Sequence, residues 1–169
     1  MKRIGLIVSF LAINLCVAQT DVVGEITLED FKATEHAQWF ERYYNAYQPN
    51  QKVVEELSTT LKNKDFTIEA YFGTWCPDSR RELPRLVKLL DDAGWDTNQL
   101  ILVGVDRSKK IPNLEKEEKK RIALKMIPTF IFNLNNKEVN RFVEYAVETI
   151  EKDVLIITQE REYKNPYSK

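Results

Sequence analysis

The sequence predicts one mixed α/β domain with a central sheet covered by helices on both faces. Two observations carry this prediction. Segments with the alternation of half-buried strands are separated by segments with the apolar spacing of amphipathic helices. One expected strand, residues 100–105, is apolar almost throughout, which is typical of a strand covered on both faces. The length of 169 residues fits a single domain.

Two helices are expected before the first strand. Thr27 can cap the first, because its hydroxyl can accept a hydrogen bond from a free N–H of the first turn. Aromatic side chains follow at helical spacing, and we interpret this stripe as core rather than as a binding face; it comprises Trp39, Phe40, Tyr43, Tyr44 and Tyr47. Residues 48–50 break the pattern, and a second amphipathic helix is expected over 53–61.

The remaining chain alternates between strands and helices. Strands are predicted at residues 65–72, 100–105, 129–132 and 139–143, with a turn at 135–137. Helices are predicted at 78–93 and 148–161, and the mixed-charge run 109–121 is expected to be a solvated loop with a short helix. Pro84 lies inside the helix 78–93, where it removes one backbone hydrogen bond and bends the axis.

The first 18 residues predict a secretory signal. Lys2 and Arg3 precede an apolar run that is too short to span a bilayer comfortably, and the run ends in small residues. We expect cleavage after Ala18, export to the periplasm, and no stable membrane insertion afterwards. An uncleaved anchor or a buried helix is the alternative. Cys16 could instead carry a lipid, but Leu15 stands where that signal has a small residue.

Composition and cysteine count exclude several classes of function. With 25 Lys and Arg against 26 Asp and Glu, the chain offers no electrostatic reason for a nucleic-acid partner. After loss of Cys16, Cys76 is the only thiol, and His36 is the only histidine. We therefore expect no internal disulfide, no metal site and no other cofactor. A single cysteine in an exported chain indicates a reactive thiol or an intermolecular partner.

Cys76 is expected at the start of a helix, directly after the first predicted strand. The free N–H groups and the positive dipole end of a first helical turn favour a thiolate over a thiol. Arg80 and Arg81 would act in the same direction, and Asp78 in the opposite one. Ser79 can offer a hydroxyl to the sulfur.

Two motifs resemble those of thioredoxin-fold proteins. The segment Phe72-Gly73-Thr74-Trp75-Cys76-Pro77-Asp78-Ser79 resembles their active-site segment, and Ile127-Pro128-Thr129-Phe130 resembles their second motif, a loop whose proline is cis. This resemblance, which runs from about residue 65 to 157, implies a thioredoxin fold in three α/β/α layers. It also implies that Cys76 is the nucleophile and that Pro128 shapes the groove in which a partner's backbone docks. By the same implication the groove is lined by Trp75, Pro77, Asp78, Ile127 and Thr129.

The resemblance also suggests a division of the chain and a subgroup. Residues 1–18 would be the signal, 19–63 a helical extension, 64–162 the thioredoxin-like domain and 163–169 a frayed tail. The motif around Cys76 looks like that of an exported bacterial subgroup with one active-site cysteine.

Two departures from the family pattern shape the predicted chemistry. The second, resolving cysteine is Ser79 here, and the buried carboxylate that assists proton transfer is replaced by Ala70, with Glu69 on the opposite side of the strand. Serine cannot close a disulfide, so we predict a monothiol mechanism in which Cys76 forms mixed disulfides. The partner would be a protein that carries a thiol or a disulfide, or a low-molecular-weight thiol. The alternative is a non-catalytic thioredoxin-fold binding module of the cell envelope.

Overall fold

The computed structural model describes residues 20–168, so the predicted signal and Cys16 lie outside the described residues. Within this range the chain forms five strands and six α-helices. The strands are β1 (Gly24–Ile26), β2 (Phe66–Phe72), β3 (Ile101–Gly104), β4 (Thr129–Leu134) and β5 (Lys137–Val143). The helices are α1 (Leu28–Lys32), α2 (Ala37–Ala46), α3 (Gln51–Lys62), α4 (Pro77–Asp92), α5 (Lys116–Ile122) and α6 (Ile150–Thr158). Among the described helices, none combines the length and the apolar character that a bilayer crossing requires.

The strands form one mixed sheet in the order β1-β3-β2-β4-β5. β2 and β3 are parallel, whereas β1, β4 and β5 each run antiparallel to the neighbour through which they join the sheet. β2 is the central strand and is buried on both faces along most of its length. Its carboxyl end leads directly into the turn that carries Cys76, so the central strand of the sheet positions the thiol.

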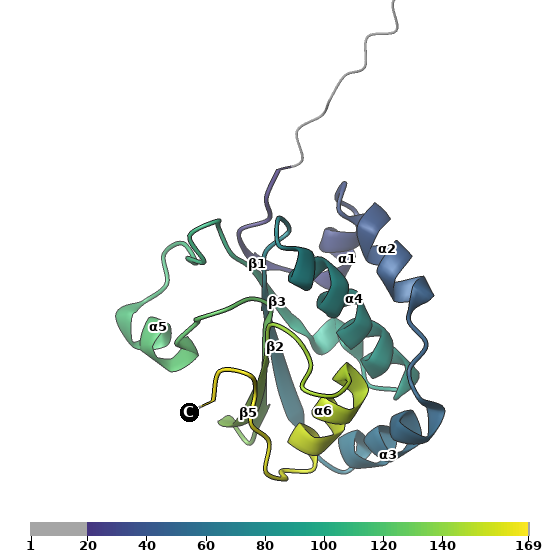
Figure 1. Cartoon of the computed structure of the whole chain (residues 1–169). Coiled ribbons are helices and arrows are strands. Elements are labelled where there is room, and N and C mark those ends of the chain that lie inside the picture. Colours follow the sequence, from purple (N-terminus) through teal and green to yellow (C-terminus); the bar gives the residue numbers. More distant parts are fainter. Residues whose placement is uncertain (1–19, 169) are drawn as a thin grey trace, which may run out of the picture.

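Helices cover both faces of the sheet, in unequal number. Figure 1 shows α5 alone on one side and the other helices on the opposite side. There α2 packs against α4, and α3 packs against α6. The fully buried aromatic side chains of this side come from α1, α2 and three strands: Phe31, Phe40, Phe72, Phe130, Phe132 and Phe142. The fold is thus mixed α/β, as the sequence predicts.

The aromatic stripe of α2 is a packing surface. Trp39 and Phe40 are buried, and Phe40 stacks on Tyr44. The hydroxyl of Tyr44 donates to Asp91 of α4 at 2.7 Å, and that of Tyr47 donates to Glu151 of α6 at 2.7 Å. The stripe therefore joins the N-terminal helices to the helices that cover the sheet. This agrees with its interpretation as core for four of the five aromatic residues, whereas Tyr43 is half-buried and does not pack against the core.

The N-terminal segment differs from the prediction in containing a strand and in forming two helices, α1 and α2, where one was expected. β1 pairs antiparallel with β3, with Gly24 opposite Gly104. A strand of three residues is too short to show an alternation of polar and apolar side chains, so only its pairing reveals it. A Cβ at Gly104 would lie 2.3 Å from the carbonyl oxygen of Val22, so the glycine permits the close approach of this segment.

Two other segments are more firmly packed than predicted. In the run 109–121, expected to be solvated, the side chains of Ile111 and Leu114 pack against the α5 face of the sheet. In the tail, expected to fray from residue 163, the hydroxyl of Tyr163 donates to Asp153 at 3.0 Å. The carbonyl of Tyr163 accepts a bond from the Asn140 side chain at 3.0 Å. Both segments are held by contacts with distant residues, which local patterns do not report.

Candidate functional site

The turn between β2 and α4 holds Cys76 as the N-cap residue of α4. The backbone N–H of Cys76 donates to the carbonyl of Gly73 at 3.0 Å, which closes the turn. Gly73 has no room for a side chain, because a Cβ there would lie 2.8 Å from Ile127 Cδ1 and 2.8 Å from the Trp75 ring. Pro77 follows as the first helical residue, where no N–H is needed. The turn and the loop at Ile127 are therefore in tight contact.

The Cys76 thiol lies against the loop that precedes Pro128. Sγ donates to the carbonyl oxygen of Ile127 at 3.6 Å, and the Ile127–Pro128 peptide bond is cis. Cys76 is 8% exposed and packs in an apolar cluster with Val105 and Ile127. Its side chain accepts no hydrogen bond from the first turn of α4. The thiol is thus held by the Ile127 carbonyl and the apolar cluster rather than by N–H groups of the helix.

Trp75 forms the half-buried edge of this cluster. Its indole Nε1–H donates to the carbonyl of Val105 at 3.2 Å, which fixes the ring between the turn and the end of β3. The guanidinium of Arg107 lies 6.0 Å from the centre of the Trp75 ring. The ring thus has a fixed orientation beside the thiol.

Ser79 does not support the sulfur as the sequence suggested. Its side chain is fully buried, and its hydroxyl oxygen accepts a bond from the Gly73 N–H at 3.2 Å. Ser79 therefore braces the turn that carries Cys76 from within. Its role in this geometry is to position the turn.

The two neighbouring arginines are also engaged elsewhere. Arg80 Nε donates to the carbonyl of Thr74 at 2.5 Å, and its guanidinium lies 5.8 Å from the centre of the Trp39 ring. Arg81 forms ion pairs with Asp78 at 2.8 Å and with Glu82 at 2.5 Å. The expected charges beside the sulfur are thus largely paired within α4 or directed toward α2.

The first described residues are bonded to the same turn. Thr74, which is fully buried, donates from its hydroxyl to Asp21 at 3.2 Å and accepts from the Val22 N–H at 3.3 Å. His36 is buried and bonds the carbonyl of Thr20 at 2.9 Å. The N-terminal segment therefore supports the thiol-bearing turn from outside the sheet.

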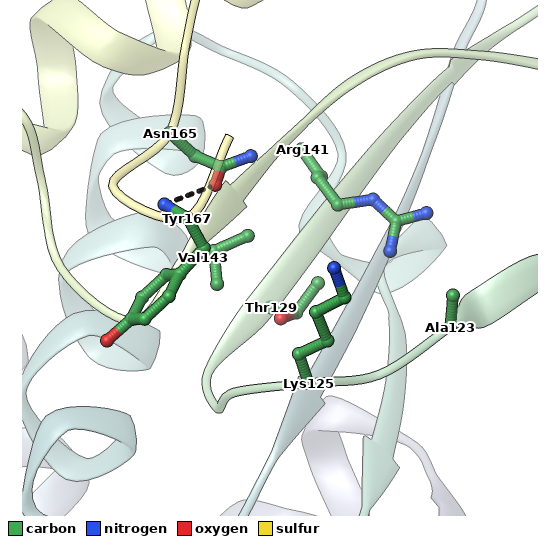
Figure 2. A pocket seen from close by; sticks show the side chains of 7 residues that line it. All are labelled: Ala123, Lys125, Thr129, Arg141, Val143, Asn165 and Tyr167. Carbon is green, nitrogen blue, oxygen red and sulfur yellow. Dashed lines mark hydrogen bonds between the residues drawn. The ribbon is translucent and has the colours of Figure 1, made fainter. Parts of the chain in front are cut away.

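Thr129 belongs to a different surface from the thiol. Its hydroxyl donates to the carbonyl of Met126 at 2.7 Å. It also lines a cavity of about 220 Å³, shown in Figure 2. The other lining residues are Ala123, Lys125, Arg141, Val143, Asn165 and Tyr167. The structure thus brings Trp75, Cys76 and Ile127 together, whereas Thr129 faces the cavity shown in Figure 2.

Glu144 lies beside the same loop, and sequence reasoning missed it. Its backbone N–H donates to the carbonyl of Pro128 at 2.7 Å. Burial raises the pKa of the Glu144 carboxyl, the charge of Asp78 acts in the same direction, and Lys109 opposes it. No local sequence pattern predicts the position of Glu144. It lies beside Pro128 because the preceding residue, Val143 of β5, pairs with Thr129 of β4.

A second acid, Glu69, is buried on the α5 face of β2. Its carboxylate accepts bonds from Arg121 at 3.0 and 2.8 Å, from Asn133 at 2.8 Å and from the Tyr71 hydroxyl at 2.5 Å. Burial alone would raise the pKa of Glu69, but the bonds from Arg121 and Tyr71 outweigh it and hold the pKa below its usual value. With these donors, Glu69 anchors α5 to the sheet rather than serving the thiol.

No group of three or more His, Cys, Asp and Glu side chains within residues 20–168 is arranged to hold a metal ion.

Comparisons with known proteins inform the fold and not the activity. No protein-family model matches the chain, and no curated protein matches it either. A solved protein of unknown function from Pseudomonas aeruginosa has a TM-score of 0.59 at 16% identity, covering 81% of this chain and 93% of its own. An HIV epitope scaffold has a TM-score of 0.59 at 17% identity, covering 83% and 95%. Thioredoxin from Fasciola hepatica has a TM-score of 0.34 at 21% identity, covering 52% and 77%, which is too low to carry an argument.

Proposed function

We propose that this is a thioredoxin-fold protein that exchanges disulfides through the single thiol of Cys76. The observation that carries the proposal is the position of that thiol, at the start of α4 and 3.6 Å from the carbonyl of Ile127, the residue before Pro128. The two sequence motifs that resemble the thioredoxin family are the two segments in contact here. Disulfide exchange requires the thiolate of Cys76 as the nucleophile.

The exchange has two steps, and each conserves electrons. Cys76 first loses its proton to solvent, and the thiolate attacks one sulfur of a partner disulfide. A bond forms between Cys76 Sγ and that sulfur, the partner's S–S bond breaks, and the second partner sulfur leaves as a thiolate. An outside thiolate then attacks the mixed disulfide, so that Cys76 leaves as a thiolate and the partner sulfur is bonded to the incoming thiol.

The outside thiol is needed because Cys76 is the only cysteine among residues 20–168. Position 79 carries a serine, and its hydroxyl is bonded to the Gly73 N–H. In the proposed cycle Ser79 keeps the turn in place and takes no part in electron transfer. The protein would act after export, in a compartment that favours disulfides.

Mass spectrometry after incubation of the native protein with oxidised glutathione tests the proposal. We expect one glutathione adduct, mapped by peptide analysis to Cys76, that a second thiol removes. The Cys76→Ser variant is the control and should carry no adduct at that position. A Cys76 thiol that stays unmodified at neutral pH in the folded protein, yet reacts after denaturation, would contradict the proposal.

A second candidate, a thioredoxin-fold binding module without redox activity, is favoured by the burial of the thiol. Cys76 is 8% exposed, and the apolar cluster around it would slow attack on a bulky disulfide. An inert thiol in the folded protein is the result that this candidate predicts. The same experiment therefore decides between the two.

A further inference from the structure

A groove on the α5 side of the sheet combines an apolar floor with a positively charged rim. It has a volume of about 200 Å³ and is lined by Lys109, Lys110, Ile111, Leu114, Lys119, Ile122 and Leu124. We call these seven residues the basic groove. Its four apolar side chains form the floor, its three lysines are the only charged residues of the lining, and no acidic side chain contributes.

The basic groove borders the surroundings of the Cys76 thiol. Ile111 and Leu124 pack on the apolar cluster of Cys76, Val105 and Ile127, and they also pack on the cluster beneath α5. Lys109 Nζ donates to the carbonyl of Lys125 at 3.1 Å, two residues before Ile127. A peptide bound in the groove would thus lie along Leu124 and Lys125. These residues lead to Ile127, whose carbonyl contacts the Cys76 sulfur.

Three lysines of this region have no ion-pair partner among the described residues. Within residues 20–168, no carboxylate forms a salt bridge with Lys110, Lys119 or Lys125. The nearby arginines, in contrast, are paired: Arg121 with Glu69 and Glu118, and Arg141 with Glu138. Figure 2 shows Lys125 extended into the cavity that Thr129 lines, and this lining also holds the cation Arg141 and no acid.

This positive surface is local. The whole chain carries a formal net charge of −1, so its average charge would not attract an acidic partner. The exposed acids at the start of α5, Glu115 and Glu117, line neither cavity. A positive rim around an apolar floor is complementary to a peptide segment that carries an apolar side chain between carboxylates. Charge complementarity therefore favours an acidic segment as the occupant of the groove.

We propose that the basic groove docks an acidic, extended segment of the partner protein whose disulfide exchanges with Cys76. An apolar side chain of that segment fills the space over Ile111 and Leu124, and its flanking carboxylates meet Lys110 and Lys119. This inference rests on the proposed function and adds the chemistry of the partner to it. The lysines also raise the rate of encounter, an effect that salt weakens.

Rates of mixed-disulfide formation with matched peptides test the inference. Three short peptides of equal length each carry one leucine and one cysteine, the cysteine as its mixed disulfide with 2-mercaptoethanol. They differ only in having glutamate, glutamine or lysine at the flanking positions. Cys76 bonds to the peptide sulfur, and 2-mercaptoethanol leaves as its thiolate. We expect the acidic peptide to react about fivefold faster than the neutral one at low salt, from two surface charge pairs, and the basic peptide to react slowest.

A charge-matched pair of variants locates the effect. Lys110→Gln with Lys119→Gln should remove most of the preference for the acidic peptide, whereas Lys52→Gln with Lys62→Gln on α3 removes the same charge elsewhere and should preserve it. Lys109 is left intact because its bond to the Lys125 carbonyl supports the loop. Equal rates for the three peptides, or equal effects of the two double variants, overturn the inference.

A binding measurement separates this inference from the proposed function. Fluorescence anisotropy follows a labelled acidic peptide, with serine in place of its cysteine, on the Cys76→Ser protein. If Cys76 proves inert, salt-sensitive binding that needs Lys110 and Lys119 still supports the groove as an acidic-segment site, and absence of binding overturns it. Binding to anionic phosphatidylglycerol vesicles that the acidic peptide does not displace would also overturn it.

Discussion

The buried ion pair between Glu69 and Arg121 predicts an asymmetry between its two partners. The Glu69 side chain is 10% exposed and that of Arg121 is 41% exposed. Arg121→Gln removes two charge-assisted bonds and leaves the buried carboxylate with only Tyr71 and Asn133 as donors. Glu69→Gln removes the buried charge itself. Losing the exposed partner should therefore cost more than losing the buried one.

The structure sets the magnitude of each loss. Breaking a fully buried pair costs about 3–5 kcal/mol and an exposed pair at most about 1 kcal/mol. With one partner 41% exposed, we expect a loss of about 2 kcal/mol in the free energy of unfolding for Arg121→Gln. Glu69→Gln should cost about 1 kcal/mol, because Arg121 keeps Glu118 and the Tyr71 hydroxyl can accept from the new amide.

The pH dependence gives a second, independent readout. In the native protein the pKa of Glu69 is lowered, so its contribution to stability is present at neutral pH and is lost as the pH falls below the ordinary value of 4.5. Without Arg121, burial would raise the pKa of Glu69 above that value, so protonation would favour the folded variant. The gap in stability between the native protein and Arg121→Gln should therefore narrow as the pH falls.

Urea unfolding followed by tryptophan fluorescence, at neutral and at acidic pH, measures both effects. Lys120→Gln removes an exposed positive charge from the same helix and serves as the control, with a change below about 0.5 kcal/mol. Two results would refute the reasoning. One is a larger loss in the free energy of unfolding for Glu69→Gln than for Arg121→Gln, and the other is a difference in stability between the native protein and Arg121→Gln that does not change with pH.

Two further changes act on the turn that carries the thiol. Ser79→Cys adds a second thiol three residues after Cys76 and should produce turnover in an insulin-disulfide reduction assay with dithiothreitol as donor; a folded variant without turnover contradicts the proposed chemistry. Gly73→Ala places a Cβ 2.8 Å from Ile127 Cδ1 and from the Trp75 ring, so it should cost about 1–3 kcal/mol and speed the alkylation of Cys76 by iodoacetamide. Unchanged alkylation and stability would show that the turn accommodates a side chain.

Local sequence signals predicted much of the fold correctly. Thr27 caps α1 by accepting from the Asp30 N–H at 3.0 Å, as its position before an apolar run indicates. The helix expected at 78–93 is α4, with Pro84 inside it. These features depend on residues within one or two turns of each other, which is the range over which capping, periodicity and proline act.

The candidate site could be predicted only in part. The place of Cys76 at a helix start follows from neighbouring residues. The family resemblance implied that Pro128 lies beside the thiol, and the structure places the carbonyl of the preceding residue, Ile127, there. The bond from Gly73 to Ser79 was not foreseen, because a hydroxyl has several possible partners and the packed turn selects one. Glu144 was missed because only the pairing of β5 with β4 brings it to Pro128.

By itself the sequence determined the alternation of helices and strands, the single thiol of the described chain and its place at the start of α4. Tertiary structure alone decided that β1 joins the sheet, that Glu69 is buried beneath Arg121, and that unpaired lysines gather beside the loop at Ile127. The physical reason is range. Backbone preferences act between neighbours, whereas burial and charge pairing depend on which distant segments the folded sheet brings together.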